Sequence, residues 1–267
     1  MLKFISFGSG SSGNCYYLNY EGYGIIIDMG IGLRGMKKYF RDFGLTMAQI
    51  NSILVTHDHT DHVKSVGALS SEFHIPVYTS KEVHDGMGRN CFMTKKVRPE
   101  EKHILLPNET VELGPFRITS FPVPHDSSGN NGYFIEFGNS TFCLATDIGH
   151  LTPEIESYLE RTNYIVVEAN YDAMMLEQGP YPRYLKKRIM GPAGHLCNDD
   201  IAKSLATHLS PNAKHIWLCH LSEENNHPEL ARKTVEKALL EAGRAVGETL
   251  TVEVLKRKVP SGIYELE

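Results

Sequence analysis

The sequence predicts an α/β protein of the α+β type, in which two mixed β-sheets pack face to face and helices cover their outer sides. Short apolar runs rich in β-branched residues are bounded by turn residues, as strands are. These runs come in groups, with helical segments after them, so the chain lacks the regular strand–helix alternation of a single parallel sheet. We therefore expect a four-layer αββα sandwich.

The first half of the chain contains expected strands at residues 2–7, 15–20, 23–27, 51–56 and 77–79. A glycine- and serine-rich loop, residues 8–14, ends the first strand, and Glu21-Gly22 turns the chain between the next two. Helices are expected over residues 35–43 and 65–73, and residues 46–49 have the spacing of a capping box.

The second half is richer in strands, which we expect over residues 111–113, 116–123, 133–137, 141–145, 164–168, 214–219 and 249–254. Turn residues such as Gly138-Asn139 separate the earlier ones. Helices are expected over residues 183–188, 198–209 and 228–242, and Asn198 is a candidate N-cap.

The composition is typical of a soluble globular protein, with 41% hydrophobic and 22% charged residues among 267. No linker or low-complexity segment divides the chain, so we expect one domain over residues 1–267. No apolar stretch is long enough to span a bilayer, and the N-terminus does not resemble an export signal, so we expect no membrane partner. The five scattered cysteines favour reduced thiols in the cytoplasm.

The net charge of −5 argues weakly against a protein that coats nucleic acid by bulk charge, although local contacts to phosphates stay possible. Basic residues cluster at residues 37–41, 95–98 and 183–188. The last cluster is interleaved with Tyr181 and Tyr184, a combination that suits single strands or frayed ends. Each cluster has an alternative interpretation as the solvated face of a helix.

The segment His57-Asp-His59-Thr-Asp61-His62 carries the strongest chemical signal in the chain. Neutral imidazole nitrogens and carboxylate oxygens bind divalent metals when they converge on one point, and a turn after a buried strand can bring them together. Asp58 and Thr60, which stand between the candidate ligands, have no role that the sequence assigns. Further candidates follow other expected strands: His125, Asp147 and His220.

The segment 56–62 resembles the H-x-H-x-D-H signature of the metallo-β-lactamase fold superfamily, and the remaining candidates occur in the order of its other motifs. The resemblance implies a dinuclear site. One metal would be bound by His57, His59 and His125, and the other by Asp61, His62 and His220. Asp147 would bridge both ions. No cysteine is among these ligands, so zinc, manganese and iron are all compatible.

Asp28 is implied to orient the site without binding metal, since a carboxylate can hold a histidine N–H. Its alternative role is that of a turn former before Gly30. In this superfamily a hydroxide that bridges the two metals is the nucleophile. The bridging Asp147 favours phosphodiesters over lactams as substrates.

Residues 7–14, 167–172, 179–182 and 194–198 resemble the YycJ/WalJ group, whose members are metal-dependent nucleases that act on DNA ends. Cys197 departs from the serine expected there. Gly194-His195 and Glu168 resemble a pair in tRNase Z that protonates the leaving oxygen or holds the phosphate. We therefore expect Asp61, His195 and Glu168 to be catalytic. The alternative for His195 is a residue at the entry of a helix.

Small residues and local cations are candidates for binding the substrate's phosphates: Ser9, Ser11, Ser12, Asn14, Asn198, Lys186 and Arg188. The alternative for the glycine- and serine-rich loop is a flexible connection between strands. The larger relatives that cut RNA carry an inserted cap domain, for which this chain is too short. An open cleft is therefore expected, framed by residues 183–188 and 95–98.

The sequence predicts a cytoplasmic phosphodiesterase with two divalent metal ions, most specifically a DNA exonuclease. RNA is a less expected substrate than DNA. An alternative is a small-molecule hydrolase of a cyclic phosphodiester or a thioester, similar to glyoxalase II, which the acidic charge favours. A metal-stabilised binding module without catalysis is the other alternative.

Overall fold

The computed structural model describes residues 1–93 and 95–267. Within this part of the chain there are two compact units. The first contains Met1–Ser120, Ser127–Asn131 and Lys256–Glu267, and the second contains Phe121–Asp126 and Gly132–Leu255.

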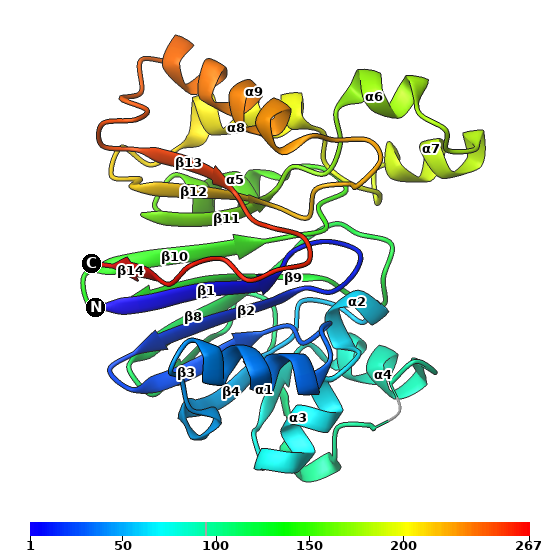
Figure 1. The fold of residues 1–267 in the computed structure, drawn as a ribbon, viewed down its shortest axis with the longest axis vertical. Helices are drawn as coiled ribbons and strands as arrows, with labels where there is room; N and C mark the ends of the chain where they lie inside the picture. Colours follow the sequence, from blue (N-terminus) through cyan, green and yellow to red (C-terminus); the bar gives the residue numbers. More distant parts are fainter. Residues whose placement is uncertain (94) are drawn as a thin grey trace. The chain divides into compact units, whose positions relative to one another are not determined.

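The first unit is built on a seven-stranded sheet with the order β14-β1-β2-β3-β4-β5-β6 (Figure 1). The strands are β14 (Tyr264–Leu266), β1 (Leu2–Gly8), β2 (Cys15–Tyr20), β3 (Tyr23–Ile27), β4 (Ile50–Leu54), β5 (Val77–Thr79) and β6 (Lys102–Ile104). Neighbouring strands from β14 to β3 are antiparallel, and those from β3 to β6 are parallel. The carboxyl ends of β3 and β4 therefore meet at one edge of the sheet.

Helices flank this sheet and supply the apolar side chains of its core. They are α1 (Leu33–Asp42), α2 (Thr60–Val63), α3 (Val66–Phe73) and α4 (Lys81–Arg89). Met36 and Phe40 of α1 pack in one cluster with the strand residues Ile26 and Ile53. Full burial of such a side chain stabilises the fold by about 1.5–3 kcal/mol.

The second sheet has the strand order β13-β12-β11-β10-β9-β8-β7. Its strands are β7 (Thr110–Leu113), β8 (Phe116–Pro122), β9 (Asn131–Phe137), β10 (Ser140–Ala145), β11 (Tyr164–Glu168), β12 (His215–Cys219) and β13 (Thr251–Val254). β10, β11, β12 and β13 are parallel, whereas β9 is antiparallel to β10. β8 carries the chain from the first unit into the second.

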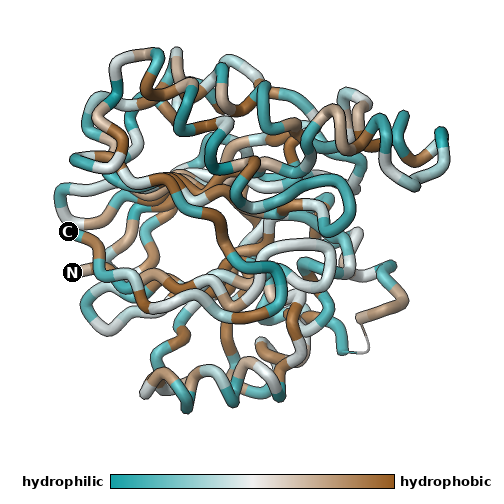
Figure 2. The backbone as a smooth tube through the Cα atoms, turned by 45° about the horizontal axis from the view of Figure 1, so that its top comes forward, coloured by the Kyte–Doolittle hydropathy of each residue, from teal (hydrophilic) through white to brown (hydrophobic). Residues whose placement is uncertain are grey.

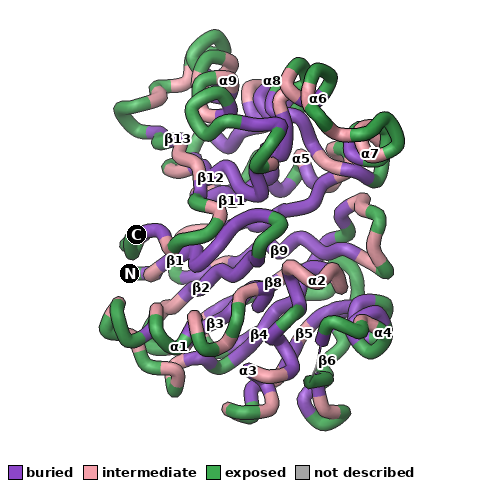
Figure 3. Tube along the Cα trace, turned by 45° about the vertical axis from the view of Figure 1, so that its right-hand side comes forward, coloured by how far each residue is buried: buried purple, intermediate pink, exposed green. Residues whose placement is uncertain are grey.

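Five helices accompany the second sheet: α5 (Pro153–Leu159), α6 (Ala173–Gln178), α7 (Arg183–Ile189), α8 (Asn198–His208) and α9 (Pro228–Glu241). Leu205 of α8 and Val235 of α9 pack in one cluster with Ile216 of β12. Figure 2 shows that the hydrophobic residues concentrate along the strands. Figure 3 shows the same strands as buried, with exposed residues along α9.

The predicted fold class is confirmed, since there are two mixed sheets flanked by helices, and most expected strands lie within a few residues of their predicted bounds. The sequence analysis missed α2, α4, α5, α6, β6 and β14, all of them short. The predicted N-cap at Asn198 is wrong, because the N-cap of α8 is Cys197. In the part of the chain that the structure covers, no helix has both the length and the apolar character needed to cross a lipid bilayer.

Candidate metal centre

The histidine-rich segment of the first unit folds into a tight group after β4. The rings of His57 and His59 have their centroids 4.7 Å apart, and those of His57 and His62 are 4.0 Å apart. Asp61 Oδ2 lies 3.6 Å from His62 Nε2. Two ligand atoms that are each about 2.0 Å from one zinc ion lie roughly 3.3 Å apart, so the separation between Asp61 and His62 suits a shared cation.

Asp28 fixes the orientation of His62 in this group. The carboxylate is fully buried; its Oδ1 accepts a hydrogen bond from Thr56 N (2.8 Å), and its Oδ2 accepts one from the Thr56 hydroxyl (2.8 Å). Asp28 Oδ2 also lies 2.7 Å from His62 Nδ1. With its proton held at Nδ1, His62 presents the lone pair of Nε2 for metal binding. Thr56, which the sequence analysis missed, likewise lies 3.0 Å from His57 Nδ1 through its hydroxyl.

The second unit holds a group of buried acidic and histidine side chains. One potential ligand atom from each member lies within 4.8 Å of all the others, and the members are Asp147, Glu168, His195 and His220. His125 Nε2 and His220 Nε2 lie 3.8 and 3.6 Å from the same Asp147 oxygen, Oδ1. These distances are too long for hydrogen bonds and leave room for a metal ion between the carboxylate and each imidazole.

The histidines of this group are also held by their Nδ1 atoms. His125 Nδ1 lies 2.9 Å from Gly194 O, and His220 Nδ1 lies 3.2 Å from Glu168 Oε1. Gly194 must lack a side chain, because a Cβ there would lie 2.2 Å from Ile189 O. With the proton at Nδ1, the lone pair of each Nε2 faces Asp147, as expected of metal ligands.

The buried Glu168 and the partly exposed His195 form a pair beside these ligands. Glu168 Oε1 lies 2.8 Å from His195 Nδ1, while Oε2 accepts hydrogen bonds from Ile148 N (2.7 Å) and Leu196 N (3.1 Å). Burial alone would lower the pKa of His195, but the Glu168 carboxylate outweighs it and the pKa is raised. Burial would raise the pKa of Glu168, but His195 outweighs it and that pKa is lowered.

Three of the predicted residues have left-handed backbone conformations directly after strands. The φ angles are +60° at Asp28, +55° at Asp147 and +52° at His220. A non-glycine residue in this region costs on the order of 1–3 kcal/mol, and such strain concentrates at functional sites. Asp28 has the positive φ of a turn residue, and its carboxylate is bonded to Thr56 N.

Several predicted phosphate contacts are buried and bonded within the chain, which corrects the prediction. Ser9 is fully buried with its hydroxyl 3.0 Å from that of Tyr16. Asn198 is 1% exposed, and its amide exchanges two hydrogen bonds with Asn226, which also explains why it does not cap α8. Neither side chain can reach a substrate without breaking these bonds. Ser11 and Ser12 are exposed.

Asn14 is also buried, and it lies against the first histidine group. Its Oδ1 accepts a hydrogen bond from Gly10 N (2.8 Å), and its Nδ2 lies 2.8 Å from His62 Nε2. That imidazole nitrogen has one lone pair, so a metal bound there would replace the contact to Asn14. Asn14 is therefore a neighbour of the metal ligands and not an exposed phosphate contact.

The two predicted cations of α7 are engaged within the second unit. Lys186 Nζ donates to Glu177 O (2.7 Å), and Arg188 donates from Nε and Nη2 to the carboxylate of Asp126 (2.6 and 3.1 Å). The bond to Asp126 raises the pKa of Arg188. Because Asp126 follows His125, Arg188 supports the loop that carries a predicted ligand.

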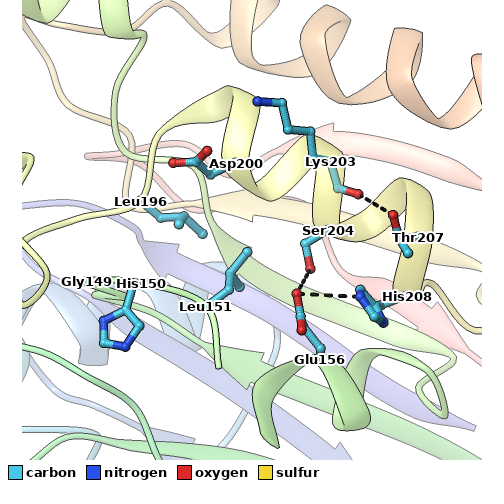
Figure 4. Close-up of a pocket in the computed structure, with 10 residues that line it drawn as sticks. All are labelled: Gly149, His150, Leu151, Glu156, Leu196, Asp200, Lys203, Ser204, Thr207 and His208. Carbon is cyan, nitrogen blue, oxygen red and sulfur yellow. Dashed lines mark hydrogen bonds and ion pairs between the residues drawn. The ribbon is translucent and has the colours of Figure 1, made fainter. Parts of the chain in front are cut away.

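A hollow of about 410 Å³ lies between α5 and α8 (Figure 4). Glu156 points toward Ser204 and His208 there, with its Oε1 3.2 Å from the Ser204 hydroxyl. His150, which follows Asp147 by three residues, also lines it, and its Nδ1 lies 2.7 Å from Pro192 O. Among the described residues, none of the predicted metal ligands lines this hollow.

Comparison with known proteins places the chain in a family. The family model described as "Beta-lactamase superfamily domain" matches residues 23–220. Exodeoxyribonuclease YycJ of Bacillus anthracis is 32% identical over 262 residues, which are 98% of each chain. Exodeoxyribonuclease WalJ of Streptococcus pneumoniae is 32% identical over 246 residues, which are 92% of this chain and 91% of WalJ.

Solved structures show the same fold at lower identity. The metallo-β-lactamase fold protein YhfI from Bacillus subtilis has a TM-score of 0.70 at 17% identity, over 97% of this chain and 98% of YhfI. Yeast PDE1 has a TM-score of 0.71 at 12% identity, over 99% of each chain. The chain belongs to the metallo-β-lactamase fold superfamily, within the group that contains YycJ and WalJ.

Proposed function

We propose that this metal-dependent hydrolase is a phosphodiesterase that degrades DNA from an end. One observation carries the proposal. Four histidines of the predicted site, His57 and His62 in the first unit and His125 and His220 in the second, have a protein acceptor at Nδ1, which favours Nε2 as the metal-binding atom. The near full-length relatives that share 32% identity carry the name exodeoxyribonuclease, which supports DNA as the substrate.

We propose further that the two groups are halves of one dinuclear centre. His57, His59 and His125 would hold one metal ion; Asp61, His62 and His220 would hold the other, and Asp147 would bridge them. The donor set of imidazoles and carboxylates fits zinc, manganese or iron. Two ions bound there would activate a water and stabilise negative charge on the attacking and leaving oxygens.

His195 is proposed to donate a proton to the leaving oxygen. Its Nδ1 is bonded to Glu168, so a protonated ring carries its other proton at Nε2, where it can be given away. The raised pKa keeps His195 protonated to a higher pH than an ordinary histidine. Asp61 is proposed to have two roles: it binds a metal ion, and it orients the attacking water.

The exposed end of the glycine- and serine-rich loop is proposed to hold a substrate phosphate. Ser12 lines a hollow of about 300 Å³ together with Gly13, Arg257 and Lys258. The two basic residues lie far from Ser12 in the sequence, so the sequence analysis missed them. Small residues and cations in one hollow favour an anionic ligand.

The proposal is tested by comparing the turnover of labelled linear DNA, labelled RNA and bis-p-nitrophenyl phosphate with Zn²⁺, Mn²⁺ or Fe²⁺. We expect metal-dependent release of nucleotides from the DNA ends. Circular DNA, which has no ends, should persist. Turnover of the small phosphodiester with linear DNA left intact would refute the nuclease proposal.

A small-molecule phosphodiester or thioester is the alternative substrate. The net charge of −5 and the engagement of Lys186 and Arg188 within the chain favour it. Replacing Arg257 and Lys258 by Ala distinguishes the two functions, because loss of a phosphate contact should raise KM for DNA and weaken its salt dependence. The matched control replaces Lys37 and Lys38 by Ala. These two lysines line a different hollow, which is formed by residues of α1.

The remaining predictions on organisation belong to the same proposal. We propose one functional domain without an inserted cap, formed by both units together. The cytoplasm is the proposed compartment, because Cys15, Cys143 and Cys197 are buried thiols outside disulfides.

A further inference from the structure

A second hollow, of about 310 Å³, lies beside the histidine motif within the first unit. We propose that it receives the base of the terminal nucleotide of the DNA, stacked on the ring of Phe92; this inference rests on the proposed nuclease function. We name it the terminal-base pocket. Its lining includes His59, Arg89, Asn90 and Phe92, so it adjoins a predicted metal ligand directly.

Phe92 is the side chain that indicates a ligand. It is 67% exposed, whereas every other phenylalanine that the structure describes is buried or half-buried. An aromatic ring kept in solvent beside a catalytic centre can stack any nucleobase, because every base has a π-face. Such stacking does not depend on base identity, which suits an enzyme that degrades DNA of any sequence.

The backbone under Phe92 is tied to the metal-binding segment. Phe92 N donates to Asn90 Oδ1 (3.0 Å), and Asn90 Nδ2 donates to Asp58 O (2.8 Å). Asn90 Nδ2 also lies 3.4 Å from the Thr60 hydroxyl. The backbone that carries Phe92 is therefore tied to the two residues that flank His59 in the chain.

Asp58 closes the floor of the pocket against α4. Its carboxylate accepts hydrogen bonds from Ser128 N (3.1 Å) and from the Ser128 hydroxyl (2.6 Å). Gly86 of α4 packs so closely that a Cβ there would lie 2.0 Å from Asp58 Oδ2. Asp58 and Thr60 thus acquire a role that the motif did not assign, which is to position the wall of this pocket.

Arg89 provides the positive charge at the same pocket. Its Nη2 donates to the Ser128 hydroxyl (3.2 Å), and a guanidinium has five N–H donors, so others can reach a phosphate. Contacts to phosphate position DNA without reading its bases. Phe92 and Arg89 should therefore have separable effects on the release of the terminal nucleotide. The effect of Phe92 should depend on the presence of a base, and that of Arg89 should not.

The test uses single-stranded DNA with ordinary nucleotides throughout or with base-free tetrahydrofuran residues at both termini. The initial release of the terminal residue is measured with the metal-loaded enzyme. We expect the wild-type protein to prefer the ordinary end on the order of 10-fold in kcat/KM, because of stacking. Phe92→Ala should abolish this preference, and Phe92→Trp should keep it.

Two further variants complete the test. Leu106→Ala, which removes a 60% exposed side chain of the same unit outside the pocket, should keep the preference. Arg89→Ala should slow the release of the terminal residue equally from ordinary and base-free ends. Phe92 lies on the surface, and an unchanged thermal unfolding midpoint of Phe92→Ala establishes that the fold is intact.

The outcomes separate this inference from the proposed function. The wild-type protein could release the terminal residue equally fast from ordinary and base-free ends, or Phe92→Ala could keep the preference. Either result refutes the terminal-base pocket and leaves the proposed nuclease function intact. If the wild-type protein releases nothing from DNA but hydrolyses a small phosphodiester, the nuclease function itself is refuted.

Discussion

Replacing Asp28 by Asn should reverse the protonation of His62. Asp28 Oδ1 accepts from Thr56 N, so an amide oxygen would take that place and the NH₂ group would replace Oδ2. Oδ2 lies 2.7 Å from His62 Nδ1. An NH₂ group there is a donor, so His62 Nδ1 must become the acceptor, and the imidazole proton moves to Nε2. A protonated Nε2 cannot bind a metal.

The size of the effect follows from the bonds that change. Losing a carboxylate that orients a ligand histidine typically costs 10- to 100-fold in metal affinity, which is about 1.4–2.8 kcal/mol. In the metal-free protein, Asn at position 28 keeps the hydrogen bond from Thr56 N. It loses the negative charge of the oxygen that accepts hydrogen bonds from the Thr56 hydroxyl and the His62 imidazole. Hydrogen bonds to charged groups contribute about 1.5–3 kcal/mol each, so the loss of two of them should lower the free energy of unfolding by roughly 3–6 kcal/mol.

Metal affinity is measured by competition between the protein and a chelator for Zn²⁺, and the tautomer of His62 by ¹⁵N NMR of the metal-free protein. The matched control is Asp85→Asn, the same chemical change at a side chain that is 50% exposed and paired with Lys81. If Asp28→Asn binds Zn²⁺ as tightly as the wild-type protein and keeps the His62 proton at Nδ1, Asp28 does not orient the site.

Three other changes are predicted from the structure. Gly30→Ala should lower the free energy of unfolding by about 3 kcal/mol or more, because its Cβ would lie 1.6 Å from Asp61 O. Urea titrations measure this change. The control is Gly32→Ala, whose Cβ would meet no described atom within 4 Å and which should match the wild-type protein. Equal midpoints for the two variants would contradict this. Glu168→Gln should move the high-pH decline of activity to lower pH, since the carboxylate raises the pKa of His195, and an unshifted pH–rate profile would rule out that role. Burial lowers the pKa of His84, so near this pKa the folded protein binds fewer protons than the unfolded chain. The free energy of unfolding should therefore be undiminished above the unfolded pKa of about 6.5 and should fall as the pH drops below it. His84→Gln should flatten that fall, and an equal slope between pH 7 and 5 would refute the assignment.

The places of Asp28 and of the proposed metal ligands Asp147 and His220 could be predicted because a local rule governs them. Asp28, Asp147 and His220 each follow a strand by one or two residues, and parallel strands present their carboxyl ends at one edge of a sheet. The histidine motif is likewise contiguous in the chain. Apolar runs mark the strands, since a buried strand needs little beyond apolar side chains.

Apart from Asp28, which the resemblance implied, the partners of those histidines could not be predicted in the same way. Thr56 and Asp28 are 28 residues apart, and His125 and Gly194 are 69 apart, so only the fold shows that they meet. Exposure is equally invisible in a sequence. Asn198 suits a helix N-cap or a phosphate contact by residue type, yet it is buried against Asn226. Phe92 resembles a core residue, yet it is exposed beside His59.

The dinuclear centre is tested most directly by measuring the rate of DNA degradation while metal-free protein is titrated with Mn²⁺ or Zn²⁺. We predict that the rate rises until two metal ions are bound per chain and then levels off, with nucleotides released from the ends of linear DNA. A rate that saturates with one bound ion would contradict the dinuclear centre. Fully loaded protein that leaves linear DNA intact would contradict the proposed function.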